Sequence, residues 1–154
     1  MLVESFSEIA EEFQARVARI AWATVATVGP DGAPRTRILH PIWEGHVGWI
    51  GTTAGSDKIR HLGREPRVSL TYWDPEQDNV HVEAIATVAA DQADRDRIWQ
   101  LFATTEPPLG YDPVLFWPSS TDPVFALLRL DPTRIELTGL RHRSSGRAPL
   151  VWRP

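Results

Sequence analysis

Short segments rich in β-branched residues, each closed by a tight turn signal, follow one another through most of this chain. The first is residues 20–28, IAWATVATV, which stops at the Gly-Pro-Asp-Gly sequence of residues 29–32. Pro34 follows, and a proline at that point belongs at the start of a strand. Residues 44–46, Glu-Gly-His, form a second turn signal before VGWIGT at residues 47–52. The first turn predicts a β-hairpin, so the segments on either side of it are expected to pair antiparallel, and the second turns the chain into its next strand.

Seven such strands and three helices are predicted in all. The strands are expected at residues 20–28, 34–41, 47–52, 68–73, 80–89, 125–130 and 134–139, and the helices at residues 8–20, 57–64 and 91–102. Ser7 is the expected N-cap of the first helix, and the last two strands meet at Asp131-Pro132. Many short strands with few helices indicate a mainly β protein, an antiparallel barrel with peripheral helices. A length of 154 residues suits one compact domain over residues 1–154.

Two segments lack any regular period. Residues 107–123 hold five prolines and are predicted to form a loop, anchored by Phe116 and Trp117. The basic tail, residues 141–154, favours a solvated surface segment. In the alternative interpretation, Arg141 to Arg143 reach over a neighbouring site.

Composition excludes several classes of protein. A hydrophobic content of 42% with 23% charged residues argues against disorder, and a net charge of −4 gives no reason to expect nucleic acid as a partner. The absence of cysteine excludes disulfides and thiolate chemistry and suits a cytoplasmic location. The acidic N-terminus has no signal-peptide pattern, and no apolar run is long enough to span a membrane. The seven tryptophans are expected mainly in cores or interfaces.

A polar stretch in the first half of the chain suits a phosphate group. Arg35 and Arg37 lie on a predicted strand, and the hydroxyl-rich loop 52–58 ends in Lys58 where a helix begins. Hydroxyls, free N–H groups and two kinds of fixed positive charge are the groups that bind phosphate. The alternative interpretation makes Ser56 an ordinary N-cap of the helix.

Other site chemistries find little support. His81 and Glu83 share a strand face, but two ligands are too few for a metal, and none is predicted. No nucleophile elbow, Rossmann fingerprint or P-loop sequence occurs. A Rossmann dehydrogenase or an NTPase is therefore not expected.

Several of these motifs occur together in one known family. Gly32-Ala33-Pro34 is followed by Arg37-Ile38-Leu39-His40, and residues 51–58 place Gly-Thr, Ser and Lys at the spacing Thr-x-x-x-Ser-x-Lys. Residues 61–73, HLGREPRVSLTYW, match a strand entry that usually reads Asn-Pro, with Glu65 in place of the Asn. In these motifs the chain resembles the pyridoxamine 5′-phosphate oxidase-like family of flavin-binding split barrels, most closely its small general-stress-protein branch.

The resemblance implies an FMN-binding oxidoreductase with a split β-barrel, acting as a homodimer on a small-molecule redox substrate. Arg37, Thr52, Ser56 and Lys58 would meet the FMN phosphate, and Ile38, Leu39, His40 and Gly51 would lie along the flavin ring. Asn79 stands where family members carry a Gln that reaches the flavin of the partner subunit. No side chain is a convincing acid or base, so catalytic residues stay unassigned.

Departures from the family pattern limit what can be transferred. Asp57 replaces a second basic residue before the loop lysine, and Thr138 stands where the oxidases carry a Trp. Arg141-His142-Arg143 is a degenerate form of the oxidases' substrate motif, so the vitamin substrate is not carried over. Two alternatives remain open: a deazaflavin-dependent reductase on the same fold, and a non-catalytic flavin-binding protein.

Overall fold

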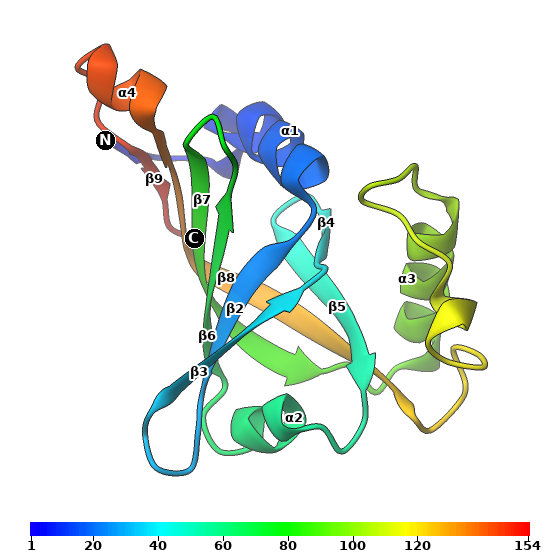
Figure 1. The fold of residues 1–154 in the computed structure, drawn as a ribbon. Coiled ribbons are helices and arrows are strands. Elements are labelled where there is room, and N and C mark those ends of the chain that lie inside the picture. Colours follow the sequence, from blue (N-terminus) through cyan, green and yellow to red (C-terminus); the bar gives the residue numbers. More distant parts are fainter.

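The computed structural model describes residues 1–154, apart from the side chain of Arg141. Nine strands and four α-helices make up the fold, with two short 3-10 helices, η1 and η2 (Figure 1). The strands are β1 (Leu2–Val3), β2 (Ala23–Val28), β3 (Pro34–Leu39), β4 (Ile42–Glu44), β5 (Val47–Thr53), β6 (Arg67–Trp73), β7 (Asp78–Val88), β8 (Phe125–Gly139) and β9 (Leu150–Trp152). The helices are η1 (Phe6–Glu8), α1 (Ala10–Ile20), α2 (Asp57–Leu62), α3 (Gln92–Thr104), η2 (Pro113–Leu115) and α4 (Leu140–Ser144).

All nine strands belong to one curled sheet. Its main path runs β1-β9-β8-β7-β6-β2-β3, and β8 also pairs with β5, which pairs in turn with β4. Within the part of the chain that the structure describes, no ladder joins β3 to β4 or β5, so the barrel stays split. Helices α1 and α2 lie at opposite ends of the curled sheet, and α3 lies beside β5 (Figure 1). This arrangement confirms the predicted split β-barrel with peripheral helices.

The hairpin predicted at the Gly-Pro-Asp-Gly turn forms, whereas the strand predicted over residues 34–41 ends at Leu39 and a separate strand, β4, pairs with β5 across the second turn. β2 and β3 pair antiparallel, with Val25 opposite Arg37, and Gly32 adopts a positive φ of 79° in the turn. Because a left-handed conformation costs glycine little, this turn can close tightly. Gly45 plays the same part between β4 and β5, with a φ of 58°.

The prediction of two strands meeting at Asp131-Pro132 was wrong, because β8 runs through both residues without a break. β5 pairs with β8 only up to Leu130, and β9 pairs with it only from Ile135. Pro132 therefore lies where that edge of β8 has no partner strand, so its missing N–H leaves no ladder bond unmade. On the other edge, the pairing with β7 shifts register at this point, as a β-bulge does.

The C-terminal tail is also more ordered than predicted. Residues 140–144 form α4, and β9 adds antiparallel to β8 and parallel to β1. Trp152 on β9 is buried and packs edge-on against the Phe6 ring. Of the residues proposed to reach over a site, Arg141 has a side chain outside the described part of the structure, while His142 is buried and Arg143 exposed.

The first helix begins differently from the prediction. Ser5, not Ser7, is the capping residue: Ser5 and Glu8 form a capping box around η1, and α1 then starts at Ala10. The spacing Ser-x-x-Glu is the signature of that box. The prediction for α3 was right, because the Asp91 side chain accepts a hydrogen bond from the main-chain N–H of Ala93.

Two hydrophobic clusters fill the molecule. The larger fills the barrel and includes Phe13, Leu70 and Tyr72, while the smaller lies between α3 and β5. Most of the tryptophans are buried in these clusters, as expected: Trp43, Trp49, Trp99, Trp117 and Trp152. In the proline-rich loop, Trp117 is buried as predicted, but Phe116 is 64% exposed and does not act as an anchor.

No helix among the described residues has the length and apolar character needed to cross a bilayer.

Candidate functional site

Arg37 is held along one side of its guanidinium group. Its Nη1 atom donates to Thr27 Oγ1 and to the main-chain oxygen of Arg35, both at 2.7 Å, with a longer contact of 3.4 Å to the main-chain oxygen of Val25. Its Nε and Nη2 atoms have no hydrogen-bond acceptor among the described residues. These two atoms form the edge of an arginine that binds a phosphate or carboxylate with two parallel hydrogen bonds. Arg35, by contrast, is paired with Asp31 in the β2–β3 turn.

Lys58 lies in the first turn of α2, and two hydroxyls meet its ammonium group. Nζ donates to Thr52 Oγ1 at 2.9 Å and to Ser56 Oγ at 3.4 Å. Ser56 is at the N-cap position, yet its side chain makes no capping bond. The interpretation of Ser56 as a simple cap is therefore not supported. Because each hydroxyl accepts from Lys58, each keeps its own proton to donate to a further group.

The two cations lie close enough to influence each other. Burial lowers the pKa of Lys58, and the neighbouring positive charge of Arg37 lowers it further. Burial lowers the pKa of Arg37 as well, while the charge of Asp57 acts in the opposite direction on both groups. Neither cation forms an ion pair with a carboxylate on any described side chain. Asp57, which is close in sequence to Lys58, pairs with the exposed Arg60 instead. Positive charge without a partner, partly removed from water, favours binding of an anion.

An apolar pocket of about 360 Å³ lies along β3 and β5. Its lining includes Ile38, Leu39, His40 and Gly51, the residues predicted to lie along a flavin ring. Ile38 follows Arg37 directly and Gly51 precedes Thr52, so the pocket shares β3 with Arg37 and β5 with the hydroxyl that accepts from Lys58.

Aromatic residues cover the other side of this pocket. They come from the residue just before β2 and from the proline-rich loop: Trp22, Tyr111, Phe116 and Trp117. A Cβ on Gly51 would lie 3.1 Å from the Tyr111 hydroxyl and 3.3 Å from the Trp117 ring, so the loop packs directly on β5. Within the pocket wall, His40 Nε2 is buried without a hydrogen-bond partner among the described residues. Burial lowers the pKa of His40, which favours the neutral imidazole, although main-chain groups of Leu109 and Pro108 oppose the shift.

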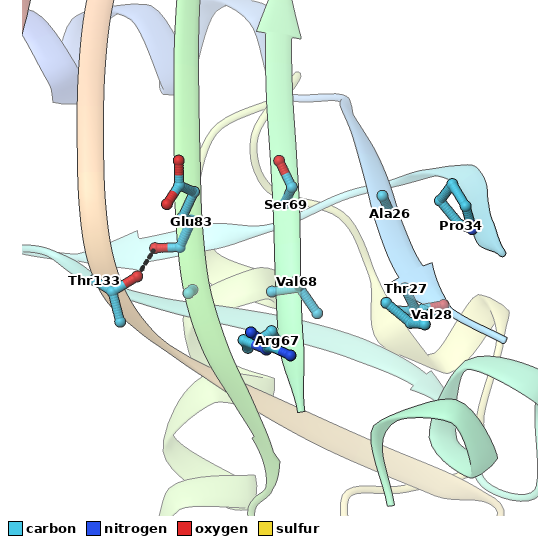
Figure 2. Close-up of a pocket in the computed structure, with 10 residues that line it drawn as sticks. Ala26, Thr27, Val28, Pro34, Arg67, Val68, Ser69, Glu83 and Thr133 are labelled. Atoms are coloured by element: carbon cyan, nitrogen blue, oxygen red, sulfur yellow. Dashed lines mark hydrogen bonds between the residues drawn. The ribbon is translucent and has the colours of Figure 1, made fainter. Parts of the chain in front are cut away.

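A second cavity, of about 370 Å³, lies across β2, β6 and β7. Figure 2 shows Ser69 and Glu83 projecting from neighbouring strands, with the Thr133 hydroxyl donating to the main-chain oxygen of Glu83. Its charged groups are already compensated, since Arg67 pairs with Glu65 and Glu83 lies 3.6 Å from an Arg134 nitrogen. No aromatic side chain lines this cavity. The apolar pocket along β3 and β5 is therefore the better candidate for a flat cofactor.

The nine predicted site residues fall into three groups. Arg37, Thr52, Ser56 and Lys58 form the cationic cluster, and Ile38, Leu39, His40 and Gly51 line the apolar pocket. Asn79 belongs to neither group. It lies near the start of β7, opposite Trp73 and Thr138, where its Nδ2 donates to the main-chain oxygen of Gln77. As for metals, the described residues contain no group of three or more side chains that could hold one.

Sequence reasoning missed four residues of the site. Thr27 and His61 contact each other at 2.9 Å beside Arg37, and Trp22 and Tyr111 line the pocket. Thr27 looks like an ordinary strand residue, and His61 looks like one more polar position on a short helix. No local pattern distinguishes them, because their contacts join segments that are far apart in the sequence.

Known proteins share this fold. The general stress protein 26-related protein of Clostridium acetobutylicum superposes with a TM-score of 0.73 at 14% identity, over 95% of this chain and 94% of that chain. The pyridoxamine 5′-phosphate oxidase-related, FMN binding protein of Nostoc punctiforme PCC 73102 superposes with a TM-score of 0.64 at 21% identity, over 90% of this chain and 86% of that chain. An F420 reductase superposes with a TM-score of 0.58 at 20% identity, over 79% of this chain and 94% of that chain. At these identities the likeness is one of fold.

The sequence comparison is more specific. No curated protein matches this chain. The sequence model of the pyridoxamine 5′-phosphate oxidase family, however, matches residues 9–139, which include both the cationic cluster and the apolar pocket. This chain belongs to the pyridoxamine 5′-phosphate oxidase family.

Proposed function

We propose that this protein is an FMN-dependent oxidoreductase that acts on a small-molecule substrate. The observation that carries the proposal is the pair of cations, Arg37 and Lys58, which have no carboxylate partner on the described side chains and lie on or next to the strands that line an apolar pocket. FMN has the matching form, a flat ring joined by a flexible chain to a phosphate. That phosphate carries about −1.5 to −2 charges near neutral pH.

The phosphate end of the site supplies donors of three kinds. The free edge of Arg37 offers two parallel N–H groups, Lys58 offers a point charge, and the hydroxyls of Thr52 and Ser56 each keep a proton. Each charge-assisted bond is worth about 1.5–3 kcal/mol. Together these groups favour FMN over riboflavin, which has the same ring and no phosphate.

The ring end of the site is lined mainly by apolar and aromatic side chains, without an acidic residue, lysine or arginine among them. Ile38 and Leu39 provide apolar contacts, and His40 has an unpaired buried nitrogen that a polar atom of the ring can satisfy. When bound, FMN supplies the redox chemistry. The contribution of the chain is to bind and orient the flavin and to shape access to it.

A second candidate is a reductase that uses the deazaflavin F420. The shared fold with an F420 reductase supports it, because such a cofactor also carries a flat ring and a phosphate-bearing chain. The fold shared with the FMN binding protein of Nostoc punctiforme supports the first candidate in the same way. We prefer FMN because the two cations and two hydroxyls form a compact cluster suited to one terminal phosphate.

Fluorescence titration of the purified protein with FMN, riboflavin and F420 tests the proposal. We expect FMN to bind at one site per subunit and at least about tenfold more tightly than riboflavin. Equal affinity for FMN and riboflavin would remove the phosphate contacts from the argument. A clear preference for F420 would replace FMN by the deazaflavin.

The proposal also includes a homodimer in which Asn79 contacts the flavin of the partner subunit. Asn79 lies away from the pocket of its own chain, and two large aromatic side chains, Trp22 and Trp73, are more than half exposed. Light scattering should return twice the 17.3 kDa mass of one chain. A mass of 17.3 kDa at micromolar concentration would contradict the dimer.

Turnover separates an enzyme from a protein that only binds the flavin. If the protein is an oxidoreductase, NAD(P)H should bleach the absorbance of the bound flavin, and an added acceptor should restore it repeatedly. A bound flavin that neither donor nor acceptor changes would indicate a binding protein without catalytic activity.

A further inference from the structure

The two cations of the proposed phosphate site repel each other, and something must hold them together when no anion is bound. The charge of Arg37 is one of the causes that lower the pKa of Lys58. They come from different elements, β3 and the start of α2. A long arginine side chain that is free to rotate would move away from a neighbouring ammonium group.

Two residues outside the predicted site connect these elements. Thr27 on β2 accepts a hydrogen bond from Arg37 Nη1 at 2.7 Å, and the same hydroxyl lies 2.9 Å from His61 Nδ1. His61 is on α2, one turn beyond Lys58. The chain of contacts from Arg37 through Thr27 to His61 therefore ends on the helix that carries Lys58.

Hydrogen-bond chemistry determines the direction of the first of these contacts. Arginine can only donate, so the Thr27 oxygen accepts from Arg37. Towards His61 Nδ1 the Thr27 hydroxyl can donate its own proton or accept with its second lone pair, depending on the tautomer of the ring, and either arrangement keeps the 2.9 Å contact. Thr27 is only 3% exposed, so water does not compete readily for this hydroxyl.

We propose that Thr27 and His61 are positioning residues that hold Arg37 beside Lys58 and turn its free Nε and Nη2 edge toward the bound phosphate. They contact Arg37 or each other, and they act on the anion through Arg37. The inference rests on the proposed FMN site and adds a reason why that site is formed before the cofactor arrives. A preformed site does not have to order these side chains during binding.

The first test replaces Thr27 by valine, which keeps the branched shape and removes the hydroxyl. We expect Thr27→Val to weaken FMN binding about tenfold, because the arginine loses its fixed orientation, and to leave riboflavin binding unchanged. Thr27→Ser keeps the hydroxyl and should restore most of the FMN affinity. A purely structural defect would weaken both ligands equally, and that result would overturn the inference.

The second test asks whether Thr27 acts through Arg37. In an Arg37→Ala background, Thr27→Val should change the FMN affinity by less than about twofold, because the group that it positions is already gone. Full additivity of the two substitutions would contradict a positioning role. If Arg37→Ala alone leaves FMN binding unchanged, the proposed phosphate contact itself fails. If Arg37→Ala weakens binding and Thr27→Val does not, only the present inference fails.

His61 provides the same test should Thr27→Val fail to fold. His61→Phe keeps a ring on α2 without an acceptor, whereas His61→Asn places an amide oxygen near the position of Nδ1. We expect His61→Phe to weaken FMN binding about threefold to tenfold and to leave riboflavin binding unchanged. His61→Asn should lose less FMN affinity than His61→Phe. Equal FMN affinity in both variants and in the unaltered protein would remove His61 from the proposed role.

Discussion

Arg37 and Lys58 form a pair of partly buried cations whose side chains find hydroxyl and main-chain acceptors but no carboxylate. Lys58 donates to Thr52 Oγ1 at 2.9 Å, and Arg37 donates to Thr27 Oγ1 at 2.7 Å. Neighbouring arginines do have an acidic partner: Arg60 pairs with Asp57 and Arg35 pairs with Asp31. The lack of such a partner among the described residues is the reason for proposing an anion site here, and the predictions below test it.

Lys58→Ala should weaken FMN binding about tenfold to a hundredfold, because one charge-assisted hydrogen bond is worth about 1.5–3 kcal/mol. Riboflavin affinity and thermal stability should hardly change, since the ammonium group has no carboxylate partner to leave unpaired. Fluorescence titration and thermal unfolding measure the two effects. Arg60→Ala is the matched control, because it removes an exposed cation from the same helix. An unchanged dissociation constant for Lys58→Ala would refute the site assignment.

Asp57→Asn should tighten FMN binding about twofold to fivefold, because removing an exposed charge changes nearby interactions by about 0.2–1 kcal/mol. The charge of Asp57 raises the pKa of both Arg37 and Lys58, so it lies near enough to oppose an incoming anion. Asp57→Lys should have a larger effect in the same direction. Both increases in FMN affinity should become smaller as salt is added, because salt screens the interaction between charges.

Asp31→Asn is the control for this charge effect. Asp31 is an exposed acid paired with Arg35 in the β2–β3 turn. Its substitution should leave FMN affinity unchanged. An equal gain in both variants would mean that overall charge, and not the position of Asp57, sets the affinity.

FMN affinity should fall in alkaline solution because Lys58 loses its proton there. Burial and the charge of Arg37 lower the pKa of Lys58 from its ordinary value of 10.5. The charged form binds the phosphate, so binding weakens as the pH rises through this lowered pKa. At the acid end, affinity should rise as the pH passes the second phosphate pKa of about 6. Titrations across pH at constant ionic strength measure both limbs.

The variant Lys58→Arg identifies the group responsible for the alkaline limb. Arginine keeps its charge at any pH that a protein tolerates. The variant should therefore retain FMN affinity at alkaline pH where the unaltered protein loses it. The same loss in both proteins would assign the alkaline limb to the flavin or to another residue.

Tyr72→Phe should destabilise the fold by about 1–3 kcal/mol, the cost of leaving a buried donor unpaired. Trp43 Nε1 donates to the Tyr72 hydroxyl at 2.8 Å inside the barrel, and burial raises the pKa of that hydroxyl. Urea unfolding measures the loss. Tyr111→Phe is the control, because no hydrogen bond of its hydroxyl is formed with the described residues, and it should cost much less. Equal costs would mean that the Trp43 bond contributes little.

Local sequence determined the elements whose causes lie within a few residues. The β2–β3 hairpin follows from a glycine with positive φ in a four-residue turn, and the start of α3 follows from the Asp91 cap. The same holds for the loop that places Lys58 beside Thr52 and Ser56, because all three lie within seven residues. Strand and turn patterns, together with the family motifs, were therefore enough to predict the split barrel and the residues of the cationic cluster.

Tertiary structure decided what depends on partners distant in the sequence. Pro132 continues through β8 because β5 and β9 both stop short of it, and the tail becomes a strand because β8 offers it a free edge. Thr27 and His61 gain a role only because β2 lies between β3 and the helix that carries Lys58. A hydrogen bond across 34 residues leaves no periodic pattern in the sequence, so the support behind Arg37 became visible only in the folded chain.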